Sequence, residues 1–323
     1  MEFIMKNLKL KVAIVSALGL TASHVFATGF VALPNTGFSV SGGTSAYTLC
    51  NTTGNFGSGI PTNPTPSANN TCAVFPANEF SSPGDPADYT GVRVFPVATN
   101  TGNITVNNTY TGGVNKNIGF YRDYLWRSND NSECIYGIKV ELNNTDYHAN
   151  SGLQNFEVND IARGGWAGLD ISAAYSTVPS IASPVYRIGL TYTAVQHRAS
   201  GYAAQPLTGL GSQPSINGLN SLPGTASATQ QKADIDDNWA VFTTDANNRD
   251  DDGSTSANSG MYYVKSDVCP ATPYTAAPNA IRLRQTFQEL AGDSVTPNNF
   301  IEITLPGFAP AGAVLTPAHT NPY

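Results

Sequence analysis

The sequence predicts an all-β protein with an irregular antiparallel β-sandwich-like fold, long loops and very little helix. The first observation is composition, because 30 Gly and 21 Pro in 323 residues favour turns over long helices. The second is periodicity: no segment carries a 3.6-residue apolar stripe, whereas several segments alternate apolar and polar residues. The third is the lack of a fixed repeat period, which disfavours propellers and solenoids. Short strands separated by turn signals are typical of a sandwich.

The expected strands are short and rich in β-branched or aromatic residues. They cover residues 92–97, 104–110, 135–142, 171–175, 185–195, 239–244, 261–264, 280–286 and 300–305. Residues 206–230 have no period and are expected to form a long surface loop, and residues 287–291 are expected to form one helical turn.

An export signal is predicted at the N-terminus. Three Lys residues precede a short apolar stretch at residues 12–20, and Val25 and Ala27 are small residues suited to a cleavage site after Ala27. We therefore expect residues 1–27 to be a signal peptide, and the mature protein to be secreted or held at a bacterial cell surface.

The mature chain is expected to form a single secreted β domain at residues 28–323. It divides into a low-charge part rich in Gly, Pro, Asn and Thr (28–110), a main body (111–308) and an extended tail (309–323). No other apolar run approaches the length needed to span a bilayer, so we expect no transmembrane segment in the mature chain.

Four cysteines follow the predicted signal: Cys50, Cys72, Cys134 and Cys269. An even number of cysteines in an exported chain predicts two disulfides. Three pairings are possible. We favour Cys50 with Cys72 and Cys134 with Cys269, because the first two share one low-charge segment and the other two flank the main body.

The charge balance argues against nucleic acid as a partner. The chain has 16 Lys and Arg against 23 Asp and Glu, a net charge of -7, and its basic residues are scattered. No established hydrolase, metalloprotease or nucleotide-binding motif is present, so we predict that the protein is not an enzyme. A Ser/His/Asp triad or a carboxylate pair remains open, because such residues need not be close in sequence.

An acidic run is the densest set of oxygen ligands in the sequence. Residues 245–255 read Asp-Ala-Asn-Asn-Arg-Asp-Asp-Asp-Gly-Ser-Thr. Calcium takes several carboxylate and carbonyl oxygens from a flexible loop. We therefore predict a structural calcium ion on Asp245, Asn247, Asp250, Asp251 and Asp252. The alternative is a solvated acidic turn.

Two histidines are candidates for a mononuclear copper site. His148 follows the expected strand 135–142, and His197 ends the expected strand 185–195. Two imidazoles at the same end of neighbouring strands suit copper, particularly when all thiols are in disulfides. The alternative is two unrelated surface histidines at strand ends.

These features together resemble the surface-associated, copper-repressible copper-binding proteins of methane-oxidising bacteria (the MopE/CorA type). The resemblance covers roughly residues 115–308. It comprises the export signal, the Tyr-Leu-Trp-Arg run at 124–127, the Cys-Ile-Tyr-Gly run at 134–137, the two histidines and the acidic run after Trp239. It implies a mostly β fold, copper on His148 and His197, and a structural calcium.

The sequence departs from that family at one point. A Trp lies two residues before a ligand His in the family's best-known pattern, whereas Asp146 and Val195 occupy those positions here. The departure leaves any third copper ligand undefined.

The predicted function is therefore that of a secreted or cell-surface protein that binds calcium structurally and copper on two histidines. Metal ions are the expected partners, with the outer cell surface and self-association as further options. The first alternative is a structural or adhesive surface protein, a layer or filament subunit, because residues 28–110 hold so few charges. The second is a secreted hydrolase or carbohydrate-binding module.

Three tryptophans and an arginine pair bear on these alternatives. Trp126, Trp166 and Trp239 are expected to be packing residues, and a sugar-binding platform is the alternative. Arg282 and Arg284 lie two apart in an expected strand and therefore share one face, where we expect a salt bridge to the acidic run.

Overall fold

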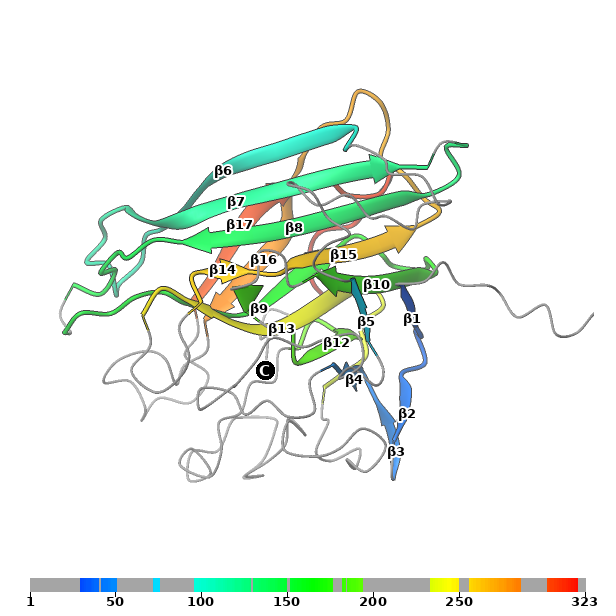
Figure 1. Ribbon diagram of the computed structural model, residues 1–323, viewed down its shortest axis with the longest axis horizontal. Helices are drawn as coiled ribbons and strands as arrows, with labels where there is room; N and C mark the ends of the chain where they lie inside the picture. The colour runs from blue at the N-terminus through cyan, green and yellow to red at the C-terminus, as the bar shows by residue number, and fades with distance from the viewer. Residues whose placement is uncertain are drawn as a thin grey trace, which may run out of the picture.

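The protein is built from strands packed in sheets (Figure 1). The computed structural model describes residues 30–50, 72–75, 96–149, 152–176, 182–193, 233–249, 256–285 and 301–318, apart from residues 41, 129 and 184. These residues contain seventeen strands and no helix, which confirms the predicted fold class. The predicted signal peptide, the loop 206–230, the turn 287–291, residues 250–252 and His197 lie outside the described residues.

The largest sheet has nine strands, most of them paired antiparallel. From one edge, β6 pairs with β7, β7 with β8, and β8 with both β14 and β15. Beyond them β14 pairs with β11, β15 pairs with β10, and β10 pairs with β1 and β5. The strands are β1 (Val31–Leu33), β5 (Ala73–Phe75), β6 (Ala98–Val106), β7 (Lys116–Arg127), β8 (Cys134–Leu142), β10 (Ile171–Ser176), β11 (Ala182–Ser183), β14 (Asn258–Ser259) and β15 (Met261–Ser266).

The second sheet has six antiparallel strands in the order β17, β16, β9, β13, β12, β4. They are β4 (Tyr47–Leu49), β9 (Glu157–Gly164), β12 (Arg187–Leu190), β13 (Trp239–Asn247), β16 (Ala277–Gln285) and β17 (Ile301–Gly307). A hairpin of β2 (Phe38–Val40) and β3 (Gly43–Ser45) forms a small third sheet.

The main core lies between the two large sheets, and Figure 1 shows strands of the six-stranded sheet passing behind β7 and β8. Phe242 of β13 stacks on Tyr262 of β15 with ring centroids 5.3 Å apart. Trp166, which follows β9, packs edge-on against Tyr136 of β8 at 5.1 Å. Aromatic contacts of this kind stabilise beyond their buried area and fix the two sheets relative to one another.

A buried ion pair also crosses between the sheets. The Asp123 carboxylate of β7 accepts a hydrogen bond from Arg163 Nη1 of β9 at 2.7 Å and another from the main-chain N–H of Phe308 at 2.6 Å. Arg163 Nη2 in turn donates to the Phe308 carbonyl oxygen at 2.6 Å. Asp123 and Arg163 are both fully buried, so this ring of hydrogen bonds fastens the segment after β17 to both sheets.

Most of the predicted strands are present, but two of the longest were missed. Strand β7 was not predicted because Arg122 and Asp123 interrupt its alternation, and β9 because Asn159, Asp160 and Arg163 do the same. The predicted strand 104–110 is partly wrong, since β6 ends at Val106 and a turn follows.

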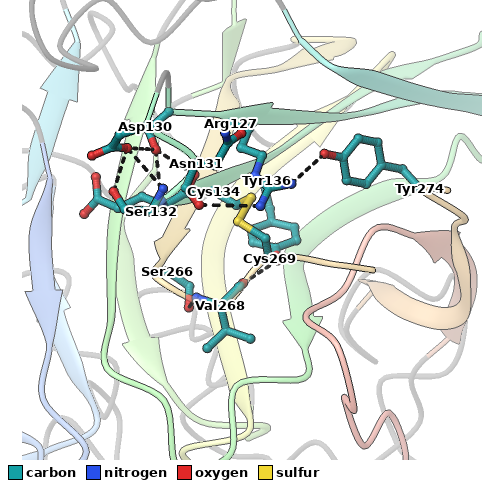
Figure 2. The surroundings of a disulfide bond; sticks show 12 residues. Arg127, Asp130, Asn131, Ser132, Cys134, Tyr136, Ser266, Val268, Cys269 and Tyr274 are labelled. Carbon is teal, nitrogen blue, oxygen red and sulfur yellow. Dashed lines mark hydrogen bonds between the residues drawn. A yellow bond between two sulfur atoms is a disulfide. The ribbon is translucent and has the colours of Figure 1, made fainter. Parts of the chain in front are cut away.

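Both favoured disulfides are present: Cys50 bonds Cys72, and Cys134 bonds Cys269. Figure 2 shows the second bond at the start of β8, where Tyr136 Oη donates to the Val268 carbonyl oxygen at 2.8 Å. In the adjoining turn, the Asp130 carboxylate accepts hydrogen bonds from the hydroxyls of Ser128 and Ser132, which lower the pKa of Asp130 to about 2. The disulfide and the turn together order this end of β8.

The three tryptophans are completely buried, as expected for packing residues. The alternative of an exposed sugar-binding platform on these rings is therefore wrong, because their faces are covered. The described start of the tail is also packed, since Ala309 and Pro310 are buried. In the part of the chain that the structure describes, no helix is long and apolar enough to cross a bilayer.

Candidate metal centre

Four buried polar side chains meet where β9 begins and β13 ends. Glu157 and Asn159 lie two apart on β9, and Asn247 of β13 is the cross-strand partner of Glu157. Directly opposite residues of an antiparallel pair project to the same face, with Cβ atoms about 5 Å apart. Asp245 joins them because Asn247 Nδ2 donates to Asp245 Oδ1 at 3.1 Å. We refer to Glu157, Asn159, Asp245 and Asn247 as the oxygen cluster.

A bulge in β13 produces this arrangement. The pairing of β13 with β9 is regular up to Thr243 and resumes at Ala246, so Thr244 and Asp245 together lie opposite Asn159 and β13 contains one extra residue. A bulge bends its strand and redirects side chains. Asp245 lies within this bulge, and Asn247 is back in register opposite Glu157.

The end of β13 is anchored to both sides of the sandwich. The Asn247 main-chain N–H donates to the Ser256 carbonyl oxygen at 3.0 Å, which pairs the end of β13 with a residue just before β14. Asn248 Nδ2 donates to the carbonyl oxygen of Leu142, the last residue of β8, at 3.3 Å. The oxygen cluster itself lies on the six-stranded sheet, and the chain that leaves it contacts β8 of the nine-stranded sheet.

The oxygen cluster is buried and its hydrogen bonding is incomplete. All four side chains are at most 4% exposed, and Asn159 Nδ2 donates to Glu157 Oε1. Among the described residues, the Asn247 side-chain oxygen Oδ1 has no hydrogen-bond partner. A buried carbonyl oxygen without a donor costs free energy that a bound cation removes.

The prediction for the acidic run is altered by this geometry. The run was expected to be a flexible loop, but Asp245 and Asn247 are buried in a strand. Asp250, Asp251 and Asp252 lie outside the described residues. Sequence reasoning missed Glu157 and Asn159, which belong to no motif and are neighbours of the run only through strand pairing. Within the described ranges, no three His, Cys, Asp or Glu side chains gather as a metal-binding group.

His148 lies in the segment that follows β8. Its ring packs against those of Tyr110, at 5.4 Å between centroids, and Tyr147, at 6.1 Å. Its main-chain N–H donates to Asp146 Oδ1 at 3.3 Å, and that carboxylate also accepts from the Gln154 N–H. These contacts fix the turn that carries the imidazole.

The premise that placed the two histidines together is wrong. Strand β8, which precedes His148, belongs to the nine-stranded sheet, whereas β12, in the region expected to end at His197, belongs to the six-stranded sheet. The two strands are therefore not neighbours. Since His197 lies outside the described residues, the copper assignment itself stays a prediction.

A second buried polar group lies on β16 and its neighbours. Arg284 Nε contacts Asp160 Oδ1 of β9 at 2.5 Å, and Arg282 Nη1 contacts Glu302 Oε1 of β17 at 2.6 Å. The expected salt bridge from these arginines to the acidic run is thus replaced by pairs with the adjacent strands. Arg284 Nη1 also donates to the Tyr192 carbonyl oxygen, which lies in the segment after β12.

Burial controls the electrostatics of this second group. It raises the pKa of Asp160 to about 6, although Arg284 acts in the opposite direction. It also lowers the pKa of Arg187 to about 10, and that guanidinium lies 4.3 Å from the centre of the Tyr47 ring. Arg282 and Arg284 lie over the rings of Trp239 and Tyr192, so each of the three arginines covers an aromatic side chain.

The carboxylates upstream of the acidic run line an open pocket of about 570 Å³. Its walls are formed by Asn35, Thr36, Asp234, Ile235, Asp236, Asp237 and Ala318. Two of these carboxylates order the turn before β13, because Asp236 Oδ1 accepts from the Asn238 N–H and Asp237 Oδ2 from the Gly168 N–H, each at 3.0 Å. Their role there is accounted for by the fold.

Comparison with known proteins adds no relative to this description. No protein-family model matches the chain, and no curated protein or solved structure matches it significantly.

Proposed function

We propose that this is an exported, cell-surface β-sandwich protein with a structural calcium ion bound at the oxygen cluster. The observation that carries the proposal is the buried Asn247 Oδ1, which lacks a hydrogen-bond partner among the described residues beside two carboxylates. Carboxylate and amide oxygens are the ligands that calcium prefers. Two buried carboxylates without a cation would also repel one another.

The proposal gives the ion a mechanical role. Glu157 and Asn159 are held on β9, while Asp245 and Asn247 are held on β13 and lead into the acidic run. A cation shared by these strands would fix the bulged end of β13 and the chain that leaves it. The ion's contribution would be to stability, because calcium of this kind cross-links chain segments rather than reacting.

The test is thermal unfolding of the purified full-length chain with calcium and with chelator. A ligand that binds the native state alone adds about 2.7 kcal/mol at a hundred times its dissociation constant. We expect a clearly higher midpoint in calcium, and we expect Asp245→Asn and Glu157→Gln to reduce the difference between the two curves. Comparing differences, rather than midpoints, separates lost binding from general destabilisation.

Asp267→Asn is the matched control. Asp267 is an exposed carboxylate just after β15, so this variant removes the same charge away from the oxygen cluster. It should keep the full calcium-dependent shift. Identical curves with calcium and with chelator for the unaltered protein would refute the calcium site.

Copper on His148 and His197 remains a separate prediction, drawn from the spacing of the histidines and from the family resemblance. Protons compete for imidazole nitrogens, so copper binding should weaken as the pH falls through about 6.5. Copper titration of His148→Ala and His197→Ala, with His319→Ala as the control, tests it. Unchanged binding in the first two variants would remove copper from the proposed function.

A further inference from the structure

The edges of the two large sheets differ in how they are protected from pairing with another strand. An edge strand presents unpaired main-chain N–H and C=O groups, and proteins usually blunt it with short length, charge or proline. The nine-stranded sheet ends on one side in β1 and β5, of three residues each, and in the two-residue β11, and the six-stranded sheet ends in the three-residue β4. Its opposite edge, β17, contains Glu302 and Pro306.

Strand β6 has none of these protections. It is nine residues long, Ala-Thr-Asn-Thr-Gly-Asn-Ile-Thr-Val, with no charged residue and no proline. It pairs with β7 on one side only among the described strands, and Figure 1 shows it along the rim of the sheet. Thr99, Thr101, Asn103 and Thr105 alternate as its exposed side chains.

The edge of β6 also has a regular register and is anchored to neighbouring strands. Its one irregularity lies between Ile104 and Thr105, so residues 98–104 form a regular stretch of about 23 Å at 3.3 Å per residue. Asn100 Nδ2 donates to the Pro306 carbonyl oxygen at 2.9 Å and to Tyr121 Oη at 3.2 Å, which ties β6 to β17 and β7. A strand that is already ordered loses little entropy when another strand adds to it.

We propose that β6 is a self-association edge, at which the β6 strand of a second copy adds antiparallel to form one continuous sheet. Two-fold symmetry pairs residue i of one copy with residue j of the other and j with i, so the strand must be complementary to itself. A charged edge would therefore meet its own charge, whereas β6 is neutral throughout. The neighbouring charge on β7 is also compensated, because Arg122 forms an ion pair with Glu141 at 2.7 Å.

The occupant is a second copy rather than a charged partner. A strongly charged peptide finds no opposite charge on β6, while an identical neutral strand finds matching Thr and Asn side chains. The net charge of -7 opposes the approach of two copies at long range, and salt screens that repulsion. The dimer should therefore strengthen with ionic strength, unlike one held by ion pairs.

The test is sedimentation of the purified full-length chain over a wide concentration range. We expect a monomer–dimer equilibrium that Thr101→Lys weakens at least tenfold, because each copy then brings a positive charge to the shared strand pair and the two like charges repel. Thr109→Lys adds the same charge to an exposed threonine three residues beyond β6 and should leave the equilibrium unchanged. Unchanged melting temperatures show that both variants are folded.

Hydrogen exchange gives an independent readout on the unaltered protein. Amides within residues 98–104 should exchange more slowly at high protein concentration than at low, while amides of β17 should not change. A chain that stays monomeric at all concentrations, or a dimer that Thr101→Lys and Asn103→Lys leave intact, overturns the proposal.

Discussion

Two buried aspartate–arginine pairs use the same chemistry in different places. Asp123 and Arg163 meet between the two large sheets, whereas Asp160 and Arg284 meet on adjacent strands of one sheet. All four side chains are at most 1% exposed. A buried pair is rarely a large net gain, but removing one partner leaves a buried charge and is costly.

The two pairs differ in the main-chain groups that complete their hydrogen bonding. Phe308 supplies both a main-chain N–H to Asp123 and a carbonyl oxygen to Arg163, so the first pair is closed into a ring by the segment after β17. The second pair is closed on the arginine side by the Tyr192 carbonyl oxygen. The first pair therefore connects three distant elements, and the second orders neighbours within a sheet.

The largest effect is expected from breaking the first pair. Asp123→Asn should lower the free energy of unfolding by about 3–5 kcal/mol, because Arg163 is left buried without a counter-charge. Denaturant unfolding at neutral pH measures the loss. Glu141→Gln, in the partly exposed pair with Arg122, is the control and should cost no more than about 1 kcal/mol. Equal losses in the two variants would show that the ring with Phe308 has no special weight.

The Asp160–Arg284 pair should make the stability of the protein depend on pH. The pKa of Asp160 in the folded protein is about 6, above its ordinary value, so between that value and pH 6 the folded state holds a proton that the unfolded state has lost. Stability from this group is full at low pH and falls as the pH rises through 6, by at most about 3 kcal/mol. Asp160→Asn should lack the fall. Parallel stability–pH curves for the two proteins between pH 4 and 7 would contradict the assignment.

The same residues explain what the sequence could and could not predict. The strands β8, β10, β13 and β15 were predicted because their apolar residues alternate or cluster. Strands β7 and β9 were not, because Asp123 on one strand and Asp160 and Arg163 on the other are buried charges that resemble surface residues in a pattern. A buried charge becomes understandable only with its partner, which lies on another strand.

The candidate metal centre shows the same limit. The acidic run drew attention to Asp245 and Asn247 by composition alone, and they are two of the four residues of the oxygen cluster. Glu157 and Asn159 are about ninety residues earlier in the chain and became visible only through the register of β9 with β13. The disulfides, by contrast, could be predicted from the sequence, because four cysteines allow only three pairings.

The smallest effect is expected at the rim of the second pair, where Glu302 contacts Arg282 and accepts a hydrogen bond from Tyr192 Oη at 2.5 Å. Glu302→Gln keeps the shape and an acceptor for Tyr192 but removes the charge. Because the Arg282–Glu302 pair is partly exposed, we expect a loss of about 1 kcal/mol or less, and less still at high salt.

The Glu302→Gln variant can also be followed through the pH dependence of stability, which would not change if Glu302 only packed against its neighbours. The Glu302 carboxylate contributes to the raised pKa of Asp160, since two nearby negative charges disfavour each other. Removing it should lower the pKa of Asp160, so the fall in stability with rising pH should end at a lower pH than in the unaltered protein. Urea unfolding in a series of buffers from pH 4 to 7 measures the position of that fall. If it does not move, Glu302 acts on Arg282 and Tyr192 alone and does not influence the pKa of Asp160.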